Sequence, residues 1–414
     1  MVANKSDIKE TSVKNQRYKN RYKKLLQFKD LQKLSKKLKS ENKKIIFTIG
    51  SFDILNPGQC RYLAEAKAAG DVLVVGISSD ESDRRIKGHN YPLISDQIRA
   101  ELVSYLKSVD YVTIIDNDRP QAALVMLRPD IFFTGEHDWE TGLRTEQDQA
   151  VLDTYGGEIY VQKKYEPYFS VSDLVEHIAS IRVLQILENY LSGKLEDFSL
   201  DLEETLRPAD FGLQIPLDRR AINANDIILS PDALKKISKK CKKEGKKTVF
   251  VSGSYDLLHV GHARFVEQAS LLGDITVVGI PSDVSVNCLK GDGRPVMSER
   301  SRAYVLANLD MVDSVVIFPE IDVLETLKKL KPDIFYTVKD SWNENYKESP
   351  EYKAVINYGG EVVLGPKQSS NISASAIINK VAQEKVQEVF KECMDKTRYA
   401  EILKERSRLN GNGQ

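Results

Sequence analysis

The second half of the chain alternates short apolar runs with segments whose apolar residues recur at helical spacing. The run KKTVFVSGSYD (246–256) is typical of a β-strand, and in the segment after it Phe265, Val266, Ala269 and Leu272 fall on one helical face. The same alternation predicts further strands over 275–283, 312–318, 332–338 and 358–365, and further helices over 298–309, 322–330 and 349–357. Alternation of this kind predicts an α/β fold with a parallel sheet and helices on both faces. In such sheets, ligands bind at the carboxyl ends of the strands, near a switch in strand order.

The first half of the chain repeats this pattern in one register. Gly50 and Gly253 are 203 positions apart. The same separation joins Lys87 with Lys290, Arg99 with Arg302, Asp110 with Asp313, Trp139 with Trp342, and Gly156 with Gly359. Each copy covers roughly 150 residues, which is the size of a whole domain rather than of a solenoid repeat. We therefore expect a basic N-terminal extension (1–29), a first domain (30–189), a connector (190–229), a second domain (230–390), and a C-terminal helix and tail (391–414).

Composition and charge favour a soluble, cytoplasmic protein. Of the 414 residues, 41% are hydrophobic and 29% charged, and Lys+Arg and Asp+Glu are equal at 60 each, so no excess of positive charge predicts a nucleic-acid or membrane partner. The basic stretch over 14–44 has helical periodicity, which favours a solvated helical face over a polyanion site. Four widely spaced cysteines indicate neither a zinc site nor a disulfide framework. No apolar run is long enough to span a membrane, and the polar start MVANKSDIKE lacks the apolar core of a secretory signal.

Two matching phrases, GSFDILNPGQ (50–59) and GSYDLLHVGH (253–262), contain the main candidate residues. His259 and His262 are two of only five histidines, and they lie where a strand is expected to pass into a helix. Gly261 would let the backbone approach a ligand closely, and the N–H groups at the start of the helix favour an anion. Two surface histidines on a turn are the alternative without function.

GSYDLLHVGH resembles the HxGH signature of the nucleotidylyltransferase superfamily, whose members share a Rossmann-like fold. The first glycine, the aspartate and both histidines match. Within that superfamily, residues 289–318 (LKGDGRPVMSERSRAYVLANLDMVDSVVIF) resemble the adenylyltransferase domain of ADP-heptose synthase, where a Lys-Gly pair, an Arg-Pro-Val and a Val-Asp pair recur in this order. The glycerol-3-phosphate and ethanolamine-phosphate cytidylyltransferases are more distantly similar. The resemblance covers essentially all of each copy and implies two tandem Rossmann-like domains with parallel sheets.

The resemblance implies that a substrate phosphate attacks the α-phosphate of a nucleoside triphosphate and releases pyrophosphate. Such catalysis consists of positioning two anions and stabilising the charge that develops between them. Carried over by position, His259 and His262 contact the triphosphate, Lys290 neutralises phosphate charge from the loop after the second strand, and Mg²⁺ is the implied cofactor. The other residues implied in nucleotide or phosphate binding are Gly253, Ser254, Tyr255, Asp256, Gly261, Arg302, Ser373 and Ser375.

The segment SNISASAII (370–378) resembles the superfamily's serine/threonine motif. Serines at the start of a helix cap it and can bind an anion, although capping alone accounts for one of them. The cytidylyltransferases carry Arg-Thr-Glu-Gly before this motif, whereas residues 367–370 here read Lys-Gln-Ser-Ser, which weakens a CTP assignment. Lys339 and Trp342 fall where relatives contact the acceptor or nucleotide, but the first copy shares the tryptophan as Trp139, which equally indicates packing.

The first copy is the degenerate one. Asn56 and Gln59 replace the two histidines, and their amides can donate hydrogen bonds but cannot carry positive charge. Losing one preorganised donor at a developing oxyanion costs roughly 10²–10³ in rate, so we expect little catalysis there. Lys87, Ser170 and Ser172 are kept, so this copy is interpreted either as a structural half that completes an intramolecular pseudo-dimer or as a regulatory nucleotide-binding half.

The sequence therefore predicts a nucleotidylyltransferase with one active site, in the second copy, that transfers NMP (AMP favoured over CMP) from an NTP to a small phosphorylated sugar or polyol. One alternative is a CTP-dependent cytidylyltransferase acting on ethanolamine phosphate or glycerol 3-phosphate, because the ethanolamine-phosphate enzyme resembles this tandem plan. Another is a non-catalytic, nucleotide-binding regulatory protein. A class I aminoacyl-tRNA synthetase is disfavoured because VMSER (296–300) lacks both lysines of the KMSKS loop.

Overall fold

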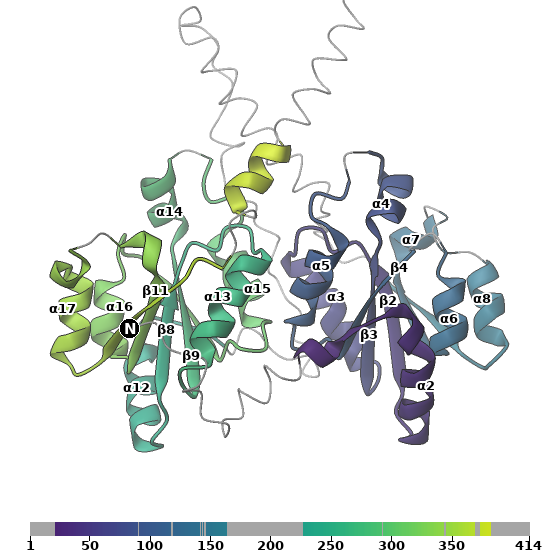
Figure 1. Cartoon of the computed structure of the whole chain (residues 1–414), viewed down its shortest axis with the longest axis horizontal. Helices are drawn as coiled ribbons and strands as arrows, with labels where there is room; N and C mark the ends of the chain where they lie inside the picture. Colours follow the sequence, from purple (N-terminus) through teal and green to yellow (C-terminus); the bar gives the residue numbers. More distant parts are fainter. Residues whose placement is uncertain are drawn as a thin grey trace, which may run out of the picture.

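A computed structural model describes residues 21–163 and 227–381, except residues 90, 117–118, 141, 143, 145, 292, 343–344 and 369–372. The expectations for most of the N-terminal extension and the connector, for the C-terminal helix and tail, and for Ser170 and Ser172 lie outside the described residues. Each copy forms one six-stranded sheet in which every strand pairing is parallel (Figure 1). The predicted α/β fold of two tandem Rossmann-like domains is confirmed.

The first sheet has the order β1-β4-β3-β2-β5-β6: after the edge strand β1 the chain enters the middle at β2, returns towards β1 through β3 and β4, and then crosses to β5 and β6. The elements of this copy are β1 (Leu25–Leu26), η1 (Phe28–Asp30), α2 (Leu31–Ser40), β2 (Ile45–Gly50), α3 (Pro57–Ala68), β3 (Val72–Ser78), α4 (Asp80–Lys87), α5 (Asp96–Ser104), β4 (Tyr111–Ile115), α6 (Gln121–Leu127), β5 (Ile131–Gly135), α7 (Glu136–Glu140), α8 (Glu146–Asp153) and β6 (Glu158–Gln162).

The second sheet has the equivalent order β7-β10-β9-β8-β11-β12, read from the opposite edge. Its elements are β7 (Ile228–Leu229), α12 (Ala233–Lys243), β8 (Thr248–Ser252), α13 (Val260–Ser270), β9 (Ile275–Pro281), α14 (Asp283–Lys290), α15 (Glu299–Ala307), β10 (Ser314–Phe318), α16 (Leu324–Leu330), β11 (Ile334–Val338), η2 (Lys339–Ser341), η3 (Tyr346–Glu348), α17 (Pro350–Asn357) and β12 (Glu361–Gly365). Residues 374–381 are also helical. The switch in strand order falls between β8 and β11, so a site there is expected at the end of β8.

Both sheets begin before the residues at which the sequence analysis placed the domains. Leu25–Leu26 pairs with β4, and Ile228–Leu229 pairs with β10, although these segments were expected in the extension and the connector. The two short strands are again 203 positions apart, so the repeat extends further towards the N-terminus than predicted. A two-residue edge strand has no alternating pattern of its own, which is why periodicity does not detect it.

In each copy, helices cover both faces of the sheet. On the outer face of the first sheet, α2, α6 and α8 supply side chains to one apolar core, and α12, α16 and α17 do the same in the second copy. On the inner faces, α3 and α5 lie opposite α13 and α15, and one continuous apolar core runs through both copies (Figure 1). The two domains therefore form a single packed unit.

The contact between the copies is pseudo-symmetric. Leu106 and Leu309, which are equivalent residues, form an antiparallel bridge. Lys107 N donates to Asn308 O (2.9 Å), and at the matching positions Asp310 N donates to Tyr105 O (2.8 Å). A pseudo-two-fold axis therefore passes between the two leucines, as expected for the intramolecular pseudo-dimer.

Charged residues reinforce this interface. Arg21 is buried and donates to Glu267 at 2.7 Å, while Tyr105 Oη donates to the same carboxylate at 3.0 Å. Arg264 forms a two-bond ion pair with Glu101, at 2.8 and 2.6 Å. Arg21 belongs to the basic stretch that was expected to face solvent. At this residue the expectation is wrong, because the guanidinium is buried in an ion pair with Glu267 of the second copy.

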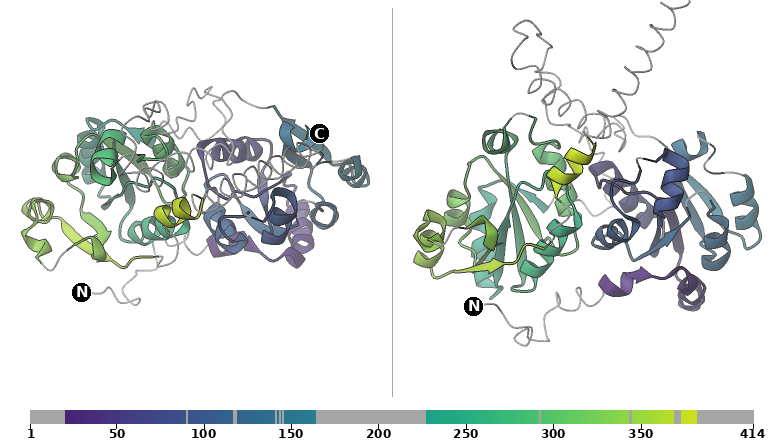
Figure 2. Two further views of the ribbon diagram at one scale, coloured as in Figure 1. Left: turned by 90° about the horizontal axis from the view of Figure 1, so that it is seen from above. Right: turned by 45° about the horizontal axis from the view of Figure 1, so that its top comes forward.

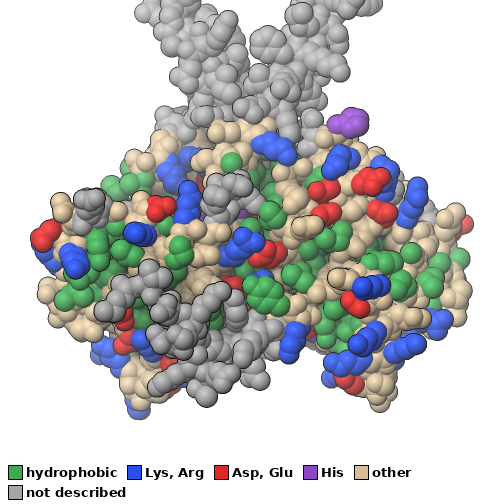
Figure 3. All heavy atoms as spheres, in the orientation of Figure 1, with side chains coloured by type: hydrophobic (Ala, Val, Ile, Leu, Met, Phe, Trp, Pro, Cys, Tyr) green, Lys and Arg blue, Asp and Glu red, His purple; other side chains and the backbone are tan. Residues whose placement is uncertain are grey.

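Most of the lysines that the structure describes in the basic stretch do face solvent. The lysines of α2 are exposed, and α12 repeats the same arrangement in the second copy. Figure 3 shows these blue side chains at the lower ends of both copies, where α2 and α12 lie in Figure 1, while elsewhere on this face both signs of charge are interspersed. Among the helices that the structure describes, none is both long enough and apolar enough to cross a membrane.

Candidate nucleotide site

The two histidines lie at the start of α13, just beyond the carboxyl end of β8. His259 is the N-cap of that helix, with an extended backbone (φ −130°, ψ 168°), and His262 N donates to His259 O at 2.9 Å. The two imidazoles stack with ring centroids 3.7 Å apart and an interplanar angle of 24°. His259 is only 7% exposed, so the alternative of two surface histidines on a turn does not describe this pair.

The loop that leads to the histidines is shaped by Gly253 and Tyr255. Tyr255 has a left-handed backbone (φ 46°), and its ring is buried. The ring packs edge-on against the His262 ring, with ring centroids 5.1 Å apart. A Cβ at Gly253 would lie 3.1 Å from Tyr255 Cε2, so glycine leaves room for the aromatic ring. The first copy has the same arrangement with Gly50 and Phe52 (φ 50°), which indicates that these two residues shape the loop in both copies.

Burial keeps both imidazoles neutral at pH 7. It lowers the pKa of His259 to about 4. Burial also lowers the pKa of His262 well below its ordinary value of 6.5; His259 and Lys290 act in the same direction, and a hydrogen bond with the Leu257 backbone opposes them. The Nδ1 atom of His259 is buried without a hydrogen-bond partner among the described residues. A buried polar atom of this kind calls for an explanation, and a ligand that donates or accepts there would supply one.

Lys290 lies beside this pair, but on a helix rather than in the predicted loop. It is the last residue of α14, and its Nζ donates to Ser254 Oγ at 2.6 Å. Loss of hydration lowers the pKa of Lys290; Asp256 opposes this effect, whereas Arg294 and Arg302 add to it. The sequence analysis missed α14 because its apolar residues do not form one buried face: Val286 is buried, whereas Val284 and Leu289 are exposed.

Asp256 holds the loop that contains Arg294, Val296 and Met297. Its carboxylate accepts from Val296 N (2.6 Å), Met297 N (3.1 Å) and Arg294 Nη1 (2.5 Å). Arg294 also donates through Nη2 to Ser375 Oγ at 3.2 Å. Sequence reasoning did not select Arg294 as a site residue, although comparison of the copies offered a signal, because the equivalent residue in the first copy is Tyr91.

The other residues predicted for phosphate binding differ in how available they are. Arg302 is fully buried and donates to Ser254 O (2.8 Å), Pro281 O (2.9 Å) and Asp283 (2.7 Å). Its guanidinium therefore holds the backbone of the site in place and is not available to a phosphate. Ser373 Oγ accepts from Ala376 N at 3.0 Å and thereby caps helix 374–381. Ser375 is exposed. Gly261 is buried in the first turn of α13.

The two weak acceptor candidates lie at the end of β11. Lys339 is exposed in η2. Trp342 donates through Nε1 to Thr337 Oγ1 at 2.9 Å and packs edge-on against Tyr346, with ring centroids 5.8 Å apart. These contacts favour the packing interpretation of Trp342, and the acceptor role of Lys339 stays a prediction.

In the first copy, the same backbone carries a closed cap instead of the histidine pair. Asn56 is the N-cap of α3 with φ −134° and ψ 169°, close to the values of His259. Its side chain accepts from Gln59 N at 3.1 Å, and Gln59 Oε1 accepts from Asn56 N at 3.3 Å, which makes a capping box. Asn56 and Gln59 therefore satisfy each other, whereas His259 makes no side-chain cap.

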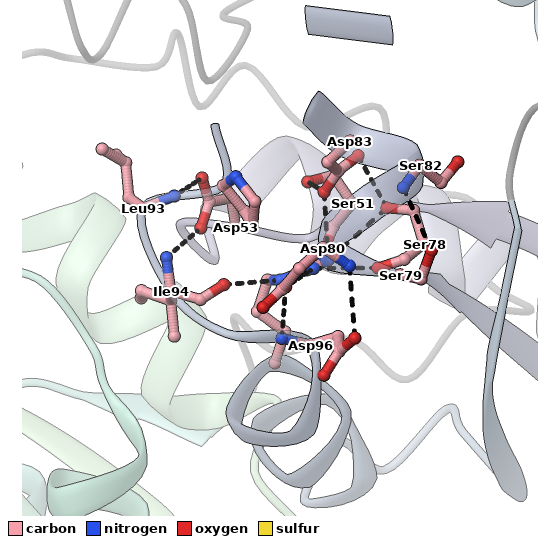
Figure 4. A network of polar contacts seen from close by, with 12 residues as sticks. Ser51, Asp53, Ser78, Ser79, Asp80, Ser82, Asp83, Leu93, Ile94 and Asp96 are labelled. Atoms are coloured by element: carbon pink, nitrogen blue, oxygen red, sulfur yellow. Dashed lines mark hydrogen bonds and ion pairs between the residues drawn. The ribbon is translucent and has the colours of Figure 1, made fainter. Parts of the chain in front are cut away.

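In each copy, a serine, a lysine and an arginine at equivalent positions form a set that we call the cradle: Ser51, Lys87 and Arg99 in the first copy, and Ser254, Lys290 and Arg302 in the second. A buried carboxylate occupies the cradle of the first copy. Asp83 is fully buried and accepts from Ser51 Oγ (2.6 Å) and Ser78 Oγ (2.8 Å), and it lies between these serines in Figure 4. Arg99 approaches it at 3.3 Å and Lys87 at 3.9 Å. The equivalent residue in the second copy is Val286, so the retained cations of the first copy already have an anionic partner within the protein.

Comparison with known proteins places the chain in a family. A cytidylyltransferase-like family model matches residues 47–156 and 250–380, one match in each copy and more than half of the chain in total. The bifunctional protein HldE of a Nitratiruptor species is 44% identical over 115 residues, which are 28% of this chain and 25% of that protein. The Helicobacter pylori HldE is 39% identical over 150 residues, 36% of this chain and 30% of that protein.

The matched region thus spans about a quarter to a third of the length of these relatives. A solved structure, a lipopolysaccharide core biosynthesis protein from Thermoplasma volcanium, is 28% identical, covers 30% of this chain and 100% of its own, and has a TM-score of 0.27. The two family matches confirm the superfamily that the HxGH signature predicted. The chain belongs to the cytidylyltransferase-like family.

Proposed function

We propose that the chain is a nucleotidyltransferase with a single active site, in the second copy, that transfers AMP from ATP to a small phosphorylated sugar or polyol. The observation that carries this proposal is the stacked pair His259 and His262 at the end of β8, where His259 Nδ1 is buried and has no hydrogen-bond partner among the described residues. Residues 289–318 resemble the adenylyltransferase domain of ADP-heptose synthase. This resemblance supports AMP as the transferred group and a phosphorylated sugar as the acceptor.

The reaction needs no covalent enzyme intermediate. An oxygen of the acceptor phosphate forms a bond to the α-phosphorus, the bond from that phosphorus to the bridging oxygen of the β-phosphate breaks, and pyrophosphate leaves with the electron pair. Neutral His259 and His262 can each donate one ring N–H to phosphate oxygens, and an incoming polyphosphate would raise the pKa of both rings by its negative charge. Lys290 and the amides at the start of α13 add positive potential.

Mg²⁺ would enter with the triphosphate. The described residues contain no group of three or more His, Cys, Asp or Glu side chains that could hold a metal ion. Asp256 is engaged by two backbone amides and Arg294, so it is not free to serve as a ligand. This is compatible with Mg²⁺, which binds largely through substrate phosphates and retained waters. When bound, it would neutralise charge on the leaving pyrophosphate.

The charges of the two cradles support a single active site. Besides the exchange of the histidines, the first copy has Tyr91 instead of Arg294 and Asp83 instead of Val286. The first cradle therefore has one cation fewer and one buried carboxylate more. A triphosphate brought there would meet Asp83 at short range in a poorly solvated site, where repulsion between like charges is strong.

The test is pyrophosphate release by the full chain with Mg²⁺, each nucleoside triphosphate in turn, and a panel of sugar, polyol and amino-alcohol phosphates. We expect release with ATP and a sugar or polyol phosphate; release only with CTP and ethanolamine phosphate or glycerol 3-phosphate would favour the cytidylyltransferase alternative, which the tandem plan supports. Nucleotide binding without release for any pair would replace the enzyme with a regulatory protein.

A matched pair of variants locates the reaction. His259→Asn with His262→Gln gives the second copy the side chains of the first, and we expect kcat/KM to fall by more than about 10²-fold because preorganised donors are lost. Gln59→Ala, at the position equivalent to His262, serves as the control and should leave turnover unchanged. Wild-type turnover in the double variant would place the reaction centre elsewhere.

A further inference from the structure

An apolar cluster joins the reaction-centre loop of the second copy to a loop of the first. Its buried members are Ile54 and Ile94 from the first copy, Leu257, Val296 and Met297 from the loops around Asp256, and Ile377, Ile378 and Val381 from helix 374–381. Ile54 and Leu257 are equivalent residues, as are Ile94 and Met297. The cluster therefore lies at the pseudo-two-fold axis, with helix 374–381 added on one side.

Helix 374–381 lies above the contact between the two copies. The views in Figure 1 and in the right panel of Figure 2 agree in placing this yellow helix next to both domains. Lys380 Nζ donates to two carbonyl oxygens of the first copy, Leu93 O at 3.1 Å and Pro92 O at 3.4 Å. The helix is thus attached to the first copy by polar as well as apolar contacts.

The loop that receives Lys380 is held in place by the first copy itself. Asp53 accepts from Leu93 N (2.7 Å) and Ile94 N (2.8 Å), and Figure 4 shows both bonds. Arg99 Nε donates to Ile94 O at 2.8 Å. Asp53 and Arg99 are fully buried, so their hydrogen bonds fix the backbone of residues 92–94 and with it the direction of the carbonyl groups that Lys380 contacts.

The other end of the helix reaches the candidate site. Ser373 caps it, and Ser375 accepts a hydrogen bond from Arg294, which in turn holds Asp256 three residues before His259. A continuous series of contacts therefore runs from Asp53 of the first copy, through residues 92–94 and helix 374–381, to Asp256 of the second.

We propose that residues 92–94 of the first copy and Lys380 form a clamp that positions the serine-bearing helix over the active site of the second copy. The degenerate copy thereby contributes to the reaction without binding substrate, and Lys380 is a positioning residue. The expected effect of the clamp on turnover rests on the proposed function. Its effect on the order of helix 374–381 does not.

The test compares Lys380→Met, which keeps the aliphatic stem, with Lys380→Arg, which keeps a charged donor. Hydrogen exchange of the backbone amides in 374–381 is measured in the full chain, together with kcat and KM for the nucleotide. The control is Lys239→Met, an exposed lysine on α12, far from the clamp (Figure 1). We expect Lys380→Met to speed exchange in 374–381 and to lower kcat/KM about three- to tenfold, as fits the loss of charge-assisted hydrogen bonds at an exposed site.

A double-mutant cycle with Ser375→Ala separates positioning from general destabilisation. If Lys380 acts through the helix, Lys380→Met should change kcat/KM less than about twofold once Ser375 is alanine, and Lys380→Arg should restore most of the wild-type value. Additive losses, or unchanged exchange in 374–381, would overturn the clamp. If the wild-type chain releases no pyrophosphate, the proposed function fails, but the exchange measurement still decides on the clamp.

Discussion

Replacing His259 with asparagine tests whether the imidazole at the start of α13 is buried and neutral in the folded protein. The first copy already has asparagine at this helix position, with nearly the same backbone angles, so the substitution is compatible with the start of α13. Asparagine is also a favoured N-cap residue. The variant therefore removes a titrating group without an obvious conformational penalty.

The expected magnitude follows from the pKa of His259, which burial lowers from 6.5 to about 4. Between these two pH values the unfolded chain binds more protons than the folded chain, so the free energy of unfolding rises with pH across this window and is lost as the pH falls. At pH 5 the linkage relation gives a loss of about 2 kcal/mol from this one group, relative to pH 7 and above. The asparagine variant should not show that loss.

The assay is urea unfolding at pH 7 and pH 5, followed by tryptophan fluorescence. Trp139→Phe is introduced into both proteins so that Trp342 reports on the second copy. The protein that retains His259 should lose about 2 kcal/mol more than the variant between the two pH values. Equal losses would show that His259 titrates normally in the folded protein, and the neutral-donor role assigned to it would then be wrong.

Two further predictions concern the interface and the first cradle. Arg21→Met leaves Glu267 buried without its cation, so we expect the free energy of unfolding in urea to fall by about 3 kcal/mol, against less than about 0.5 for the exposed Lys37→Met; similar losses would contradict a stabilising role for the pair. Calorimetric titration with a non-hydrolysable nucleoside triphosphate should give one site per chain, and Asp83→Val with Tyr91→Arg, which copies the charges of the second cradle, should add a second, weaker site. Two sites in the wild-type chain would refute the closed first cradle.

The architecture could be predicted because its signals are local or repeated. Apolar runs marked the central strands, and the constant separation of 203 showed that both copies have one fold. The placement of His259 and His262 followed from their position between a strand pattern and a helix pattern. These inferences need no knowledge of which residues meet across the fold.

The features that sequence reasoning missed depend on distant partners. Asp83 sits among charged residues in DESDRRIK and looks like one more exposed acid, but Ser51 and Arg99, 32 and 16 positions away, make it a buried anion. The contact of Lys380 with Leu93 spans 287 positions. Comparison of equivalent positions gave a partial signal, since Asp83 is equivalent to Val286 and Tyr91 to Arg294 in the alignment of the two copies.

The pairing of Leu106 with Leu309 has a consequence for how the two halves can differ. In a symmetric homodimer, every substitution appears in both subunits, so a carboxylate that closed one cradle would close the other as well. Within one chain the two halves stay together at any protein concentration, and each position mutates independently of its counterpart. The tandem arrangement therefore lets one half become a permanent support while the other keeps its chemistry.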